Sequence, residues 1–182
     1  MVYFFTPYSL NHDLGKVYNE YVNLVPNKED YICLVDGDVS FISNDWGHQI
    51  QEIIDLHGNN VGLFTCLTNR VGTLCQCYNG IISENSDIIS HRKIALELSR
   101  GEKRLQIKQI PNPISGHLML FKKETWESVG GFPEERGILS VDNTFSNRMN
   151  RHGYKIAVME GLYVLHYYRL AEGRRNKSHL LP

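Results

Sequence analysis

Two aspartates separated by one glycine directly follow a short apolar run, residues 31–35. Such a run, rich in β-branched residues, predicts a buried strand. Asp36 and Asp38 then lie at the end of the strand where ligands bind in open α/β sheets, and Gly37 permits a turn that lets the two carboxylates converge. Hard oxygen ligands of this kind suit Mg²⁺ or Mn²⁺, which in turn bind phosphates. The alternative is a simple hairpin, because Asp-Gly is a strong turn signal, and the motif alone does not decide.

Two further residues could add chemistry to such a site. Asp142 falls in the first turn of a helix that Ser140 would cap, where the helix dipole favours an ionised carboxylate. Acids are common in first turns for that reason alone, but a carboxylate there could also act as a general base. His166 ends an apolar strand, where a histidine more often makes ordinary hydrogen bonds. It becomes a candidate ligand if a metal is already bound nearby.

Cations and aromatic residues form a second group of candidates. Arg169 and Lys16 could contact phosphate oxygens, with solvated surface charge as the alternative and the better interpretation for Lys16. Trp126 and Phe132 flank a Gly-Gly corner, where either ring could stack on a sugar or belong to the core.

The predicted elements place the polar candidates at strand and helix ends. A strand at residues 2–6, a helix from Asp13 to Val25 and the strand at 31–35 would form a βαβ unit whose two strands open on the same side. Downstream we expect a helix capped by Ser43 or Asn44 and ended by Gly58, a strand at 61–67, an irregular stretch at 68–82, a helix at 86–99, strands at 103–110 and 116–121, helices at 123–129 and from Ser140 to Gly153, and one or two strands at 155–168 interrupted at Gly161.

The composition is that of one soluble globular domain. The chain has 182 residues, is 42% hydrophobic and carries a net charge of −1, which argues against a nucleic-acid binder held by general electrostatics. It has no apolar run long enough to span a membrane, and its first residues lack the basic region of a signal peptide. The four cysteines show no disulfide or zinc spacing, so a soft-metal site at Cys66, Cys75 and Cys77 is disfavoured and we expect a cytoplasmic protein.

Three segments, in this order, resemble nucleotide-sugar glycosyltransferases of family 2, which have the GT-A fold. Residues 30–39 (DYICLVDGDV) look like the family's DxD strand. Residues 115–132 are similar to its strand, helix and "GGF" corner, and residues 142–155 with 164–166 look like its "ED…R…G-Y/F-K…H" block. The resemblance implies a compact GT-A-like, Rossmann-like domain at residues 1–168 with an open mixed sheet flanked by helices. Residues 169–182 would then be a basic polar tail.

The resemblance also implies roles for single residues. Asp38 would bind a divalent cation, Mn²⁺ or Mg²⁺, on the donor diphosphate; Asp36 would contact the ion or the ribose, and His166 would be a further ligand. Asp142 would be the base that activates the acceptor hydroxyl, with inversion at the anomeric carbon. Those expected to contact the nucleotide are Thr6, Pro7, Asp36 and Arg169, and those expected to contact the acceptor are Trp126, Gly131 and Phe132.

The implied activity is transfer from a nucleoside-diphosphate sugar, with a UDP-sugar as the first expectation, to a glycan, lipid-linked or protein acceptor. The basic tail has the charge to touch a membrane surface or a phosphorylated acceptor, although three charges so spaced usually only keep a tail soluble. Two departures from the family pattern keep other functions open. Only 35 residues precede Asp36, about half of the family's usual length, and Val141 stands where the family often has Glu. The alternatives are a degenerate nucleotide-sugar-binding or interaction module and a metal-dependent phosphohydrolase using Asp36 and Asp38.

Overall fold

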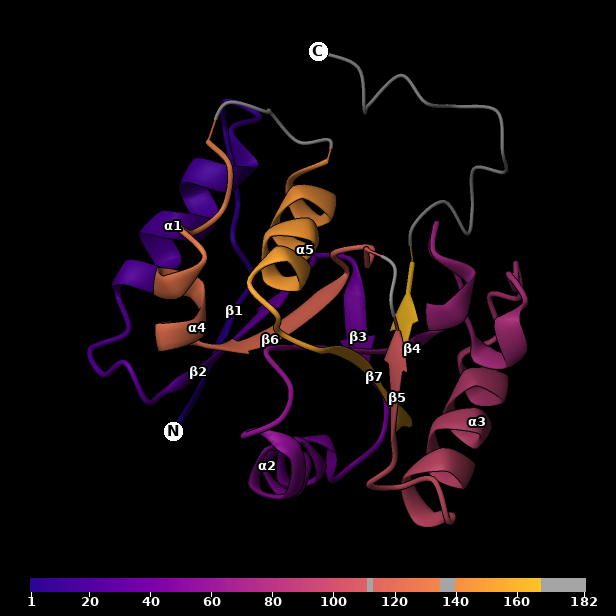
Figure 1. The fold of residues 1–182 in the computed structure, drawn as a ribbon. Coiled ribbons are helices and arrows are strands. Elements are labelled where there is room, and N and C mark those ends of the chain that lie inside the picture. The colour runs from indigo at the N-terminus through magenta and orange to yellow at the C-terminus, as the bar shows by residue number, and fades with distance from the viewer. Residues whose placement is uncertain (111–112, 135–139, 168–182) are drawn as a thin grey trace.

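The computed structural model describes residues 1–110, 113–134 and 140–167, and these form an α/β structure with one seven-stranded mixed sheet (Figure 1). The strands are β1 (Val2–Phe5), β2 (Tyr31–Val35), β3 (Val39–Phe41), β4 (Leu63–Thr68), β5 (Ile107–Ile110), β6 (Leu118–Lys122) and β7 (Ile156–His166). The helices are α1 (Leu14–Asn23), α2 (Trp46–His57), α3 (Ile88–Arg100), α4 (Lys123–Ser128) and α5 (Val141–Arg151), with short 3-10 turns at Leu74–Gln76 and Tyr78–Gly80. Among these, no helix is long and apolar enough to cross a membrane.

The sheet has the order β1-β2-β6-β4-β7-β3, and β5 pairs with β7 in addition. The pairs β1/β2 and β4/β7 are parallel, whereas β6 is antiparallel to both β2 and β4. The βαβ unit expected at the start of the chain is confirmed, as is the α/β class with an open mixed sheet and flanking helices. The predicted boundaries at residues 168 and 169 lie beyond the last described residue.

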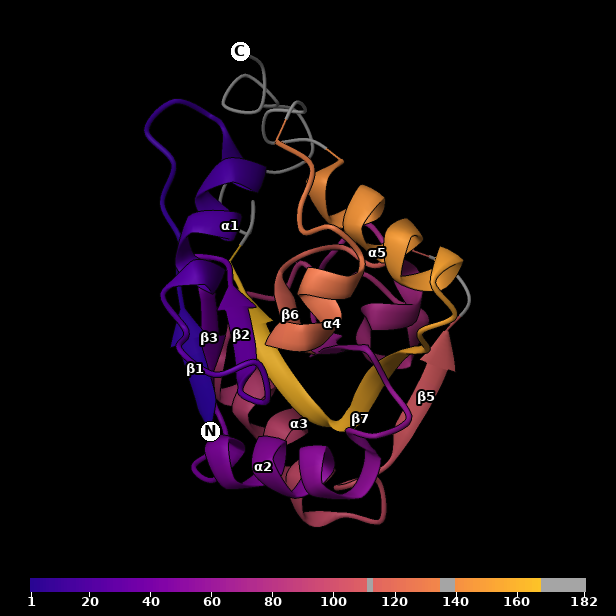
Figure 2. The ribbon, with the colours of Figure 1, turned by 60° about the vertical axis from the view of Figure 1, so that its left-hand side comes forward.

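Helices cover both faces of the sheet because its central strands are apolar on both sides (Figures 1 and 2). In β2, Ile32 and Leu34 pack in one core cluster with side chains of α1 and α5, while Cys33 and Val35 pack in a second cluster with α2. This burial on both faces explains why β2 reads as a continuous apolar run rather than an alternating one. A third, smaller cluster packs Ala95 and Leu98 of α3 against Tyr163 in the second half of β7.

Strand β7 is a single strand rather than two, and it carries the register irregularity of the sheet. Its pairing with β4 shifts between Cys66, opposite Met159, and Leu67, opposite Tyr163. Gly161 lies in the shifted segment, where a Cβ would come within 2.4 Å of the Arg104 carbonyl oxygen. The first half of β7 pairs with β5 and its last three residues pair with β3. Gly161 therefore bends the strand instead of ending it.

The hairpin alternative for the Asp-Gly-Asp stretch is wrong. The chain does turn there, with the Val39 amide donating to the Asp36 carbonyl. However, the strand that follows, β3, pairs with β7 and not with β2. We did not expect β3, which is only three residues long and pairs with the distant end of β7. Its Phe41 ring stacks on Trp46, with 4.0 Å between the ring centroids.

The predicted N-terminal caps of two helices are also wrong. The residue before α2 is Asp45, with no side-chain cap, and neither Ser43 nor Asn44 caps the helix. Ser140 does precede α5, but its backbone is left-handed with φ 71°, and its side chain makes no cap hydrogen bond. A left-handed residue points its side chain away from the geometry that a capping hydroxyl needs. Gly58 does end α2, as expected.

Candidate metal and catalytic site

The turn after β2 and the end of β7 meet at one edge of the sheet. Asp36 is held by its own amide, which donates to the His117 carbonyl in front of β6. The carbonyl of Asp38 accepts from the Tyr167 amide just after β7, at 2.8 Å. Backbone hydrogen bonds thus connect the Asp-Gly-Asp turn to two neighbouring strands. The result is that Asp36 and Asp38 converge with His166, and one ligand atom from each lies within 4.8 Å of the others.

His166 is oriented by the backbone around it. Its ring Nδ1 lies 2.8 Å from the Arg70 carbonyl oxygen, and because a carbonyl can only accept, Nδ1 carries the proton. Nε2 is then the nitrogen that faces Asp38, at 3.2 Å from Oδ1. The Asn69 side chain accepts from the His166 amide and donates to the His166 carbonyl. A histidine with one nitrogen on a backbone carbonyl and the other beside carboxylates has the orientation typical of a metal ligand.

The electrostatics of this cluster are those of a crowded, partly buried anionic site. The pKa of Asp36 is raised to about 6, mainly by burial and also by the charges of Asp38 and Asp142, against the opposing charge of His166. Burial also acts on Asp38, but the hydrogen bond and charge of His166 outweigh it and hold the pKa of Asp38 below its ordinary value. The same pairing with Asp38 overcomes burial and raises the pKa of His166. A divalent cation would relieve this mutual repulsion, so the donor set fits a cation of the Mn²⁺ or Mg²⁺ type.

Asp142 faces the same cavity from the start of α5. Its Oδ2 accepts from the Gly116 amide at 2.7 Å, and its Oδ1 accepts from the Asn143 amide at 2.8 Å. Burial raises the pKa of Asp142, although these two amides pull it in the opposite direction. A Cβ on Gly116 would lie 3.0 Å from the Asp142 Cβ, so the glycine leaves room for this close approach. Asp142 is therefore a fixed carboxylate with raised basicity.

One cavity of about 500 Å³ contains all four of these side chains. The residues that line it are Asp36, Asp38, Val71, Gly72, Ser115, Gly116, His117, Ser140, Asp142, Asn143 and His166. Five segments that are separate in the sequence thus form a single site. Its volume is in the range of small-molecule sites, which measure about 300–1,000 Å³.

A buried polar network supports the cavity wall, and we did not single out its members from the sequence. The Gln76 side chain accepts from the Ser115 amide at 2.7 Å and donates to the Ser115 carbonyl and to Thr65 Oγ1. Gln76 therefore fixes the residue next to Gly116, which donates to Asp142. His117 is fully buried beside His166, and burial lowers its pKa to about 3, so it is neutral.

Tyr18 is another residue whose role near the site was not visible in the sequence. It fitted the apolar face of α1, and its ring does pack against Phe132 at 5.0 Å between centroids. Burial raises its pKa well above the ordinary value, and the charges of Asp36 and Asp142 add to the shift. The phenol therefore stays protonated while it experiences the field of both carboxylates.

The remaining predicted site residues are not lining residues of this cavity. The methyl group of Thr6 lies 3.6 Å from where a Gly37 Cβ would be, so the end of β1 is beside the turn, and the half-buried Pro7 comes next in the chain. Phe132 is 2% exposed and stacks on Phe145, and Trp126 donates to the Asn19 side chain. The predicted acceptor contacts of these two aromatic residues and of the buried Gly131 stay predictions. Arg169 lies outside the described residues.

No model of a known protein family and no curated protein matches the sequence. Among solved structures, the chain is similar to the mannosyltransferase PcManGT from Pyrobaculum calidifontis in complex with GDP-Man and Mn²⁺. The sequence identity is 15% and the TM-score 0.49, and the match covers 83% of this chain but 35% of the other. The chain therefore spans about a third of the length of that protein.

Proposed function

We propose that this protein is a metal-dependent, inverting glycosyltransferase that moves a sugar from a nucleoside-diphosphate sugar to an acceptor hydroxyl. The observation that supports this best is the presence of Asp36, Asp38, His166 and Asp142 in one cavity of about 500 Å³. Three of these side chains are suited to bind a cation, and the fourth lies across the cavity without being part of that cluster. The motif resemblance assigns the metal-ligand and general-base roles to the same residues.

Asp38 and His166, with Asp36, would hold the divalent cation. When bound, the cation would neutralise the negative charge that develops on the departing nucleoside diphosphate. The hydrogen bond from His166 Nδ1 to the Arg70 carbonyl keeps the ring in the orientation that presents Nε2 to the cluster. Asp36 is placed to contact either the ion or the ribose of the donor.

Asp142 would act as the general base. The acceptor oxygen attacks the anomeric carbon, the bond from that carbon to the diphosphate oxygen breaks, and the electron pair leaves with the nucleoside diphosphate. The hydroxyl proton goes to the Asp142 carboxylate, whose raised pKa makes it a better base. Because both carboxylate oxygens are held by backbone amides, the base is positioned before the substrate arrives.

The proposal also carries the finer predictions from the motifs. A UDP-sugar is the first donor to test, with Thr6, Pro7 and Arg169 as nucleotide contacts. Trp126, Gly131 and Phe132 are the predicted acceptor contacts, and the acceptor is a glycan, a lipid-linked molecule or a protein. Residues 1–168 would form the catalytic domain of a cytoplasmic enzyme, and the basic residues of 169–182 would allow peripheral contact with a membrane.

The decisive variant is Asp142→Asn, which keeps the shape of the base and removes its basicity. We expect sugar transfer to fall by about 10²–10⁴-fold, the usual contribution of a general base, while nucleotide binding in the presence of Mn²⁺ is unchanged. Asp55→Asn is the matched control, because Asp55 is exposed on α2 and lines neither this cavity nor its neighbours. Normal transfer by Asp142→Asn would refute the assignment of the base. Phosphate release from simple phosphate esters that does not need Asp142 would instead indicate a phosphohydrolase.

A further inference from the structure

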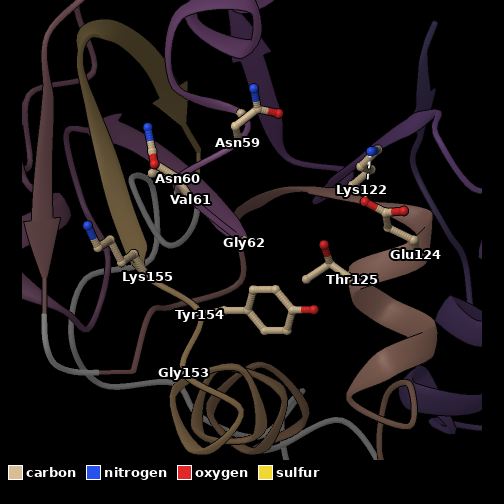
Figure 3. A pocket seen from close by; sticks show the side chains of 11 residues that line it. Asn59, Asn60, Val61, Gly62, Lys122, Glu124, Thr125, Gly153, Tyr154 and Lys155 are labelled. Atoms are coloured by element: carbon tan, nitrogen blue, oxygen red, sulfur yellow. Dashed lines mark hydrogen bonds and ion pairs between the residues drawn. The ribbon is translucent and has the colours of Figure 1, made fainter.

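A second cavity, of about 330 Å³, lies at the opposite end of β6 from the candidate catalytic site (Figure 3). Its lining residues are Gly58, Asn59, Asn60, Val61, Gly62, Lys122, Glu124, Thr125, Gly153, Tyr154 and Lys155. They come from the loop before β4, the end of β6, the start of α4 and the loop before β7. Since a strand advances about 3.3 Å per residue, the length of β6 alone separates the two sites by about 13 Å.

The ring of Tyr154 is the central aromatic surface of this cavity, and it is held on two sides. A Cβ on Gly62 would lie 2.7 Å from the Tyr154 Cβ and 2.8 Å from its ring carbons, so the ring packs directly on the glycine. At its other end the Tyr154 hydroxyl shares a 2.9 Å hydrogen bond with Ser128 Oγ. Figure 3 shows the ring between Lys155 and Asn60 on one side and Thr125, Glu124 and Lys122 on the other. A ligand would therefore meet a ring that is already ordered.

Thr125 supplies a hydroxyl group that the protein itself does not use. Thr125 is only 6% exposed as a residue, and its hydroxyl bonds to none of the described residues but still reaches the solvent of the cavity. In Figure 3 the hydroxyl is directed toward the cavity. A hydroxyl that is open to the cavity and that no described residue occupies can form a hydrogen bond to a bound molecule in place of water.

The charges around the cavity balance. Lys122 lies in ion pairs with both Glu124, at 2.7 Å, and Glu29, and hydrogen bonds to the two carboxylates raise its pKa. Lys155 adds one positive charge, so these two lysines and two glutamates sum to zero. A phosphate-type anion would have to compete with two carboxylates for Lys122. The remaining polar groups, the amides of Asn59 and Asn60, both donate and accept hydrogen bonds.

We propose that this second cavity binds one unit of an uncharged saccharide. An ordered aromatic face, amides that donate and accept, a carboxylate and an unused hydroxyl match the apolar C–H face and the hydroxyl groups of a sugar ring. The cavity shares no lining residue with the site that contains Asp38, so binding is independent of a divalent cation. This saccharide site is distinct from the donor site of the proposed transferase, and it does not depend on that proposal being correct.

The test is a titration of the ¹⁵N-labelled full chain with the methyl glycosides of glucose, mannose and N-acetylglucosamine, followed by amide chemical shifts without added metal. We expect at least one glycoside to shift the amides of Gly62, Thr125, Gly153 and Tyr154, with millimolar affinity. The Asp38→Ala variant should show the same shifts and the same affinity. Inorganic phosphate is the comparison probe and should leave these amides unmoved.

Three variants assign the binding to the cavity. Thr125→Val should weaken binding about threefold or more, the effect of one lost hydrogen bond, and Tyr154→Leu should weaken it further by removing the ring face. Tyr154→Phe is the matched control: it keeps the face and loses only a hydroxyl that already bonds to Ser128, so affinity should be retained. The dispersion of the amide spectrum reports whether each variant is folded.

Several results would overturn the proposal. These are an absence of shifts at the four amides with every glycoside at tens of millimolar, shifts caused by phosphate and not by glycosides, or wild-type affinity in a folded Tyr154→Leu variant. Glycoside binding that requires Mn²⁺ and is lost in Asp38→Ala would place the sugar at the catalytic cavity instead. None of these outcomes tests nucleotide binding, so the saccharide site and the proposed transferase function can fail separately.

Discussion

The two ends of β6 border two cavities that differ in net charge and in how their polar groups are hydrogen-bonded. At the end near His117, three carboxylates and a histidine crowd together, and the buried amides and carbonyls around them are paired, as Gln76 and Asn69 show. At the end near Lys122, charges balance at the surface and the hydroxyl of Thr125 is open to the cavity and bonds to none of the described residues. A cluster with excess negative charge, whose side chains are held by hydrogen bonds, suits a cation. A cavity whose surrounding charges sum to zero suits a neutral ligand.

The largest effect should be on cation binding when its histidine ligand is removed. His166→Ala takes away Nε2 and the ring that faces Asp38, so we expect Mn²⁺ affinity to fall at least about 100-fold. Titration calorimetry with Mn²⁺ measures this directly. His57→Ala is the matched control, because His57 contacts the Leu105 carbonyl at the end of α2 and should leave the affinity unchanged. Equal loss in both variants would indicate general destabilisation instead of a lost ligand.

The next largest effect should be the pH dependence of the same affinity. Pairing with Asp38 raises the pKa of His166 against the effect of burial, and burial raises that of Asp36 to about 6. Both groups must lose their protons before they can bind a cation, so affinity should fall as pH falls through this range. We expect a loss of about tenfold or more between pH 7.5 and 5.5 in calorimetric titrations. An affinity that is constant over this range would exclude these two residues as ligands.

Gln76→Ala should reduce stability and, separately, weaken positioning of the base. The substitution leaves the Ser115 amide and carbonyl without their partner, which costs about 1–3 kcal/mol of unfolding free energy for buried groups. Urea unfolding measures the loss, and Gln51→Ala, which removes an exposed hydrogen bond to Asp55, should cost less than about 0.5 kcal/mol. If Gln76 positions Asp142 through Ser115 and Gly116, kcat falls while Mn²⁺ affinity stays constant. A parallel loss of both would contradict a positioning role.

Thr125→Val should have the smallest effect on stability, and it compares the cavity at the Lys122 end of β6 with the cavity at the His117 end. Because the Thr125 hydroxyl bonds to none of the described residues, replacing it with a methyl group breaks no hydrogen bond within the described part of the chain. We expect the unfolding free energy to change by less than about 0.5 kcal/mol or to rise slightly. Urea unfolding of this variant beside Gln76→Ala makes the comparison. A loss similar to that of Gln76→Ala would show that the hydroxyl is engaged in the folded protein.

Much of the fold follows from local sequence signals. The strand at Tyr31–Val35 and the helix at Trp46–His57 have apolar patterns that match the faces they bury, so their positions are confirmed to within a few residues. Strand β3 has no such signal, because three residues pair with the distant end of β7 and gain their burial from Trp46. The continuation of β7 through Gly161 as one strand was also not predictable, because it depends on two different strands that pair with its two halves.

The candidate site divides in the same way. Asp36, Asp38, Asp142 and His166 were predictable because carboxylates and a histidine at strand and helix ends carry a chemical signal, and the structure brings them into one cavity. Gln76, Asn69 and Tyr18 were not, because a buried amide or a tyrosine on an apolar helix face has no distinctive spacing. Their roles come from hydrogen bonds and charges that only the folded chain brings together.

The most direct test of the central claim is calorimetric binding of UDP, GDP and their sugar conjugates, with and without Mn²⁺, to the wild type and to Asp38→Ala. Asp55→Ala serves as a control for an exposed aspartate far from the cavity. The proposed function predicts that one nucleotide binds in the presence of Mn²⁺, that binding is lost without the ion or in Asp38→Ala, and that Asp55→Ala binds normally. The absence of binding for every nucleotide at millimolar concentration in the presence of Mn²⁺, or binding that is equally strong in Asp38→Ala, would contradict it.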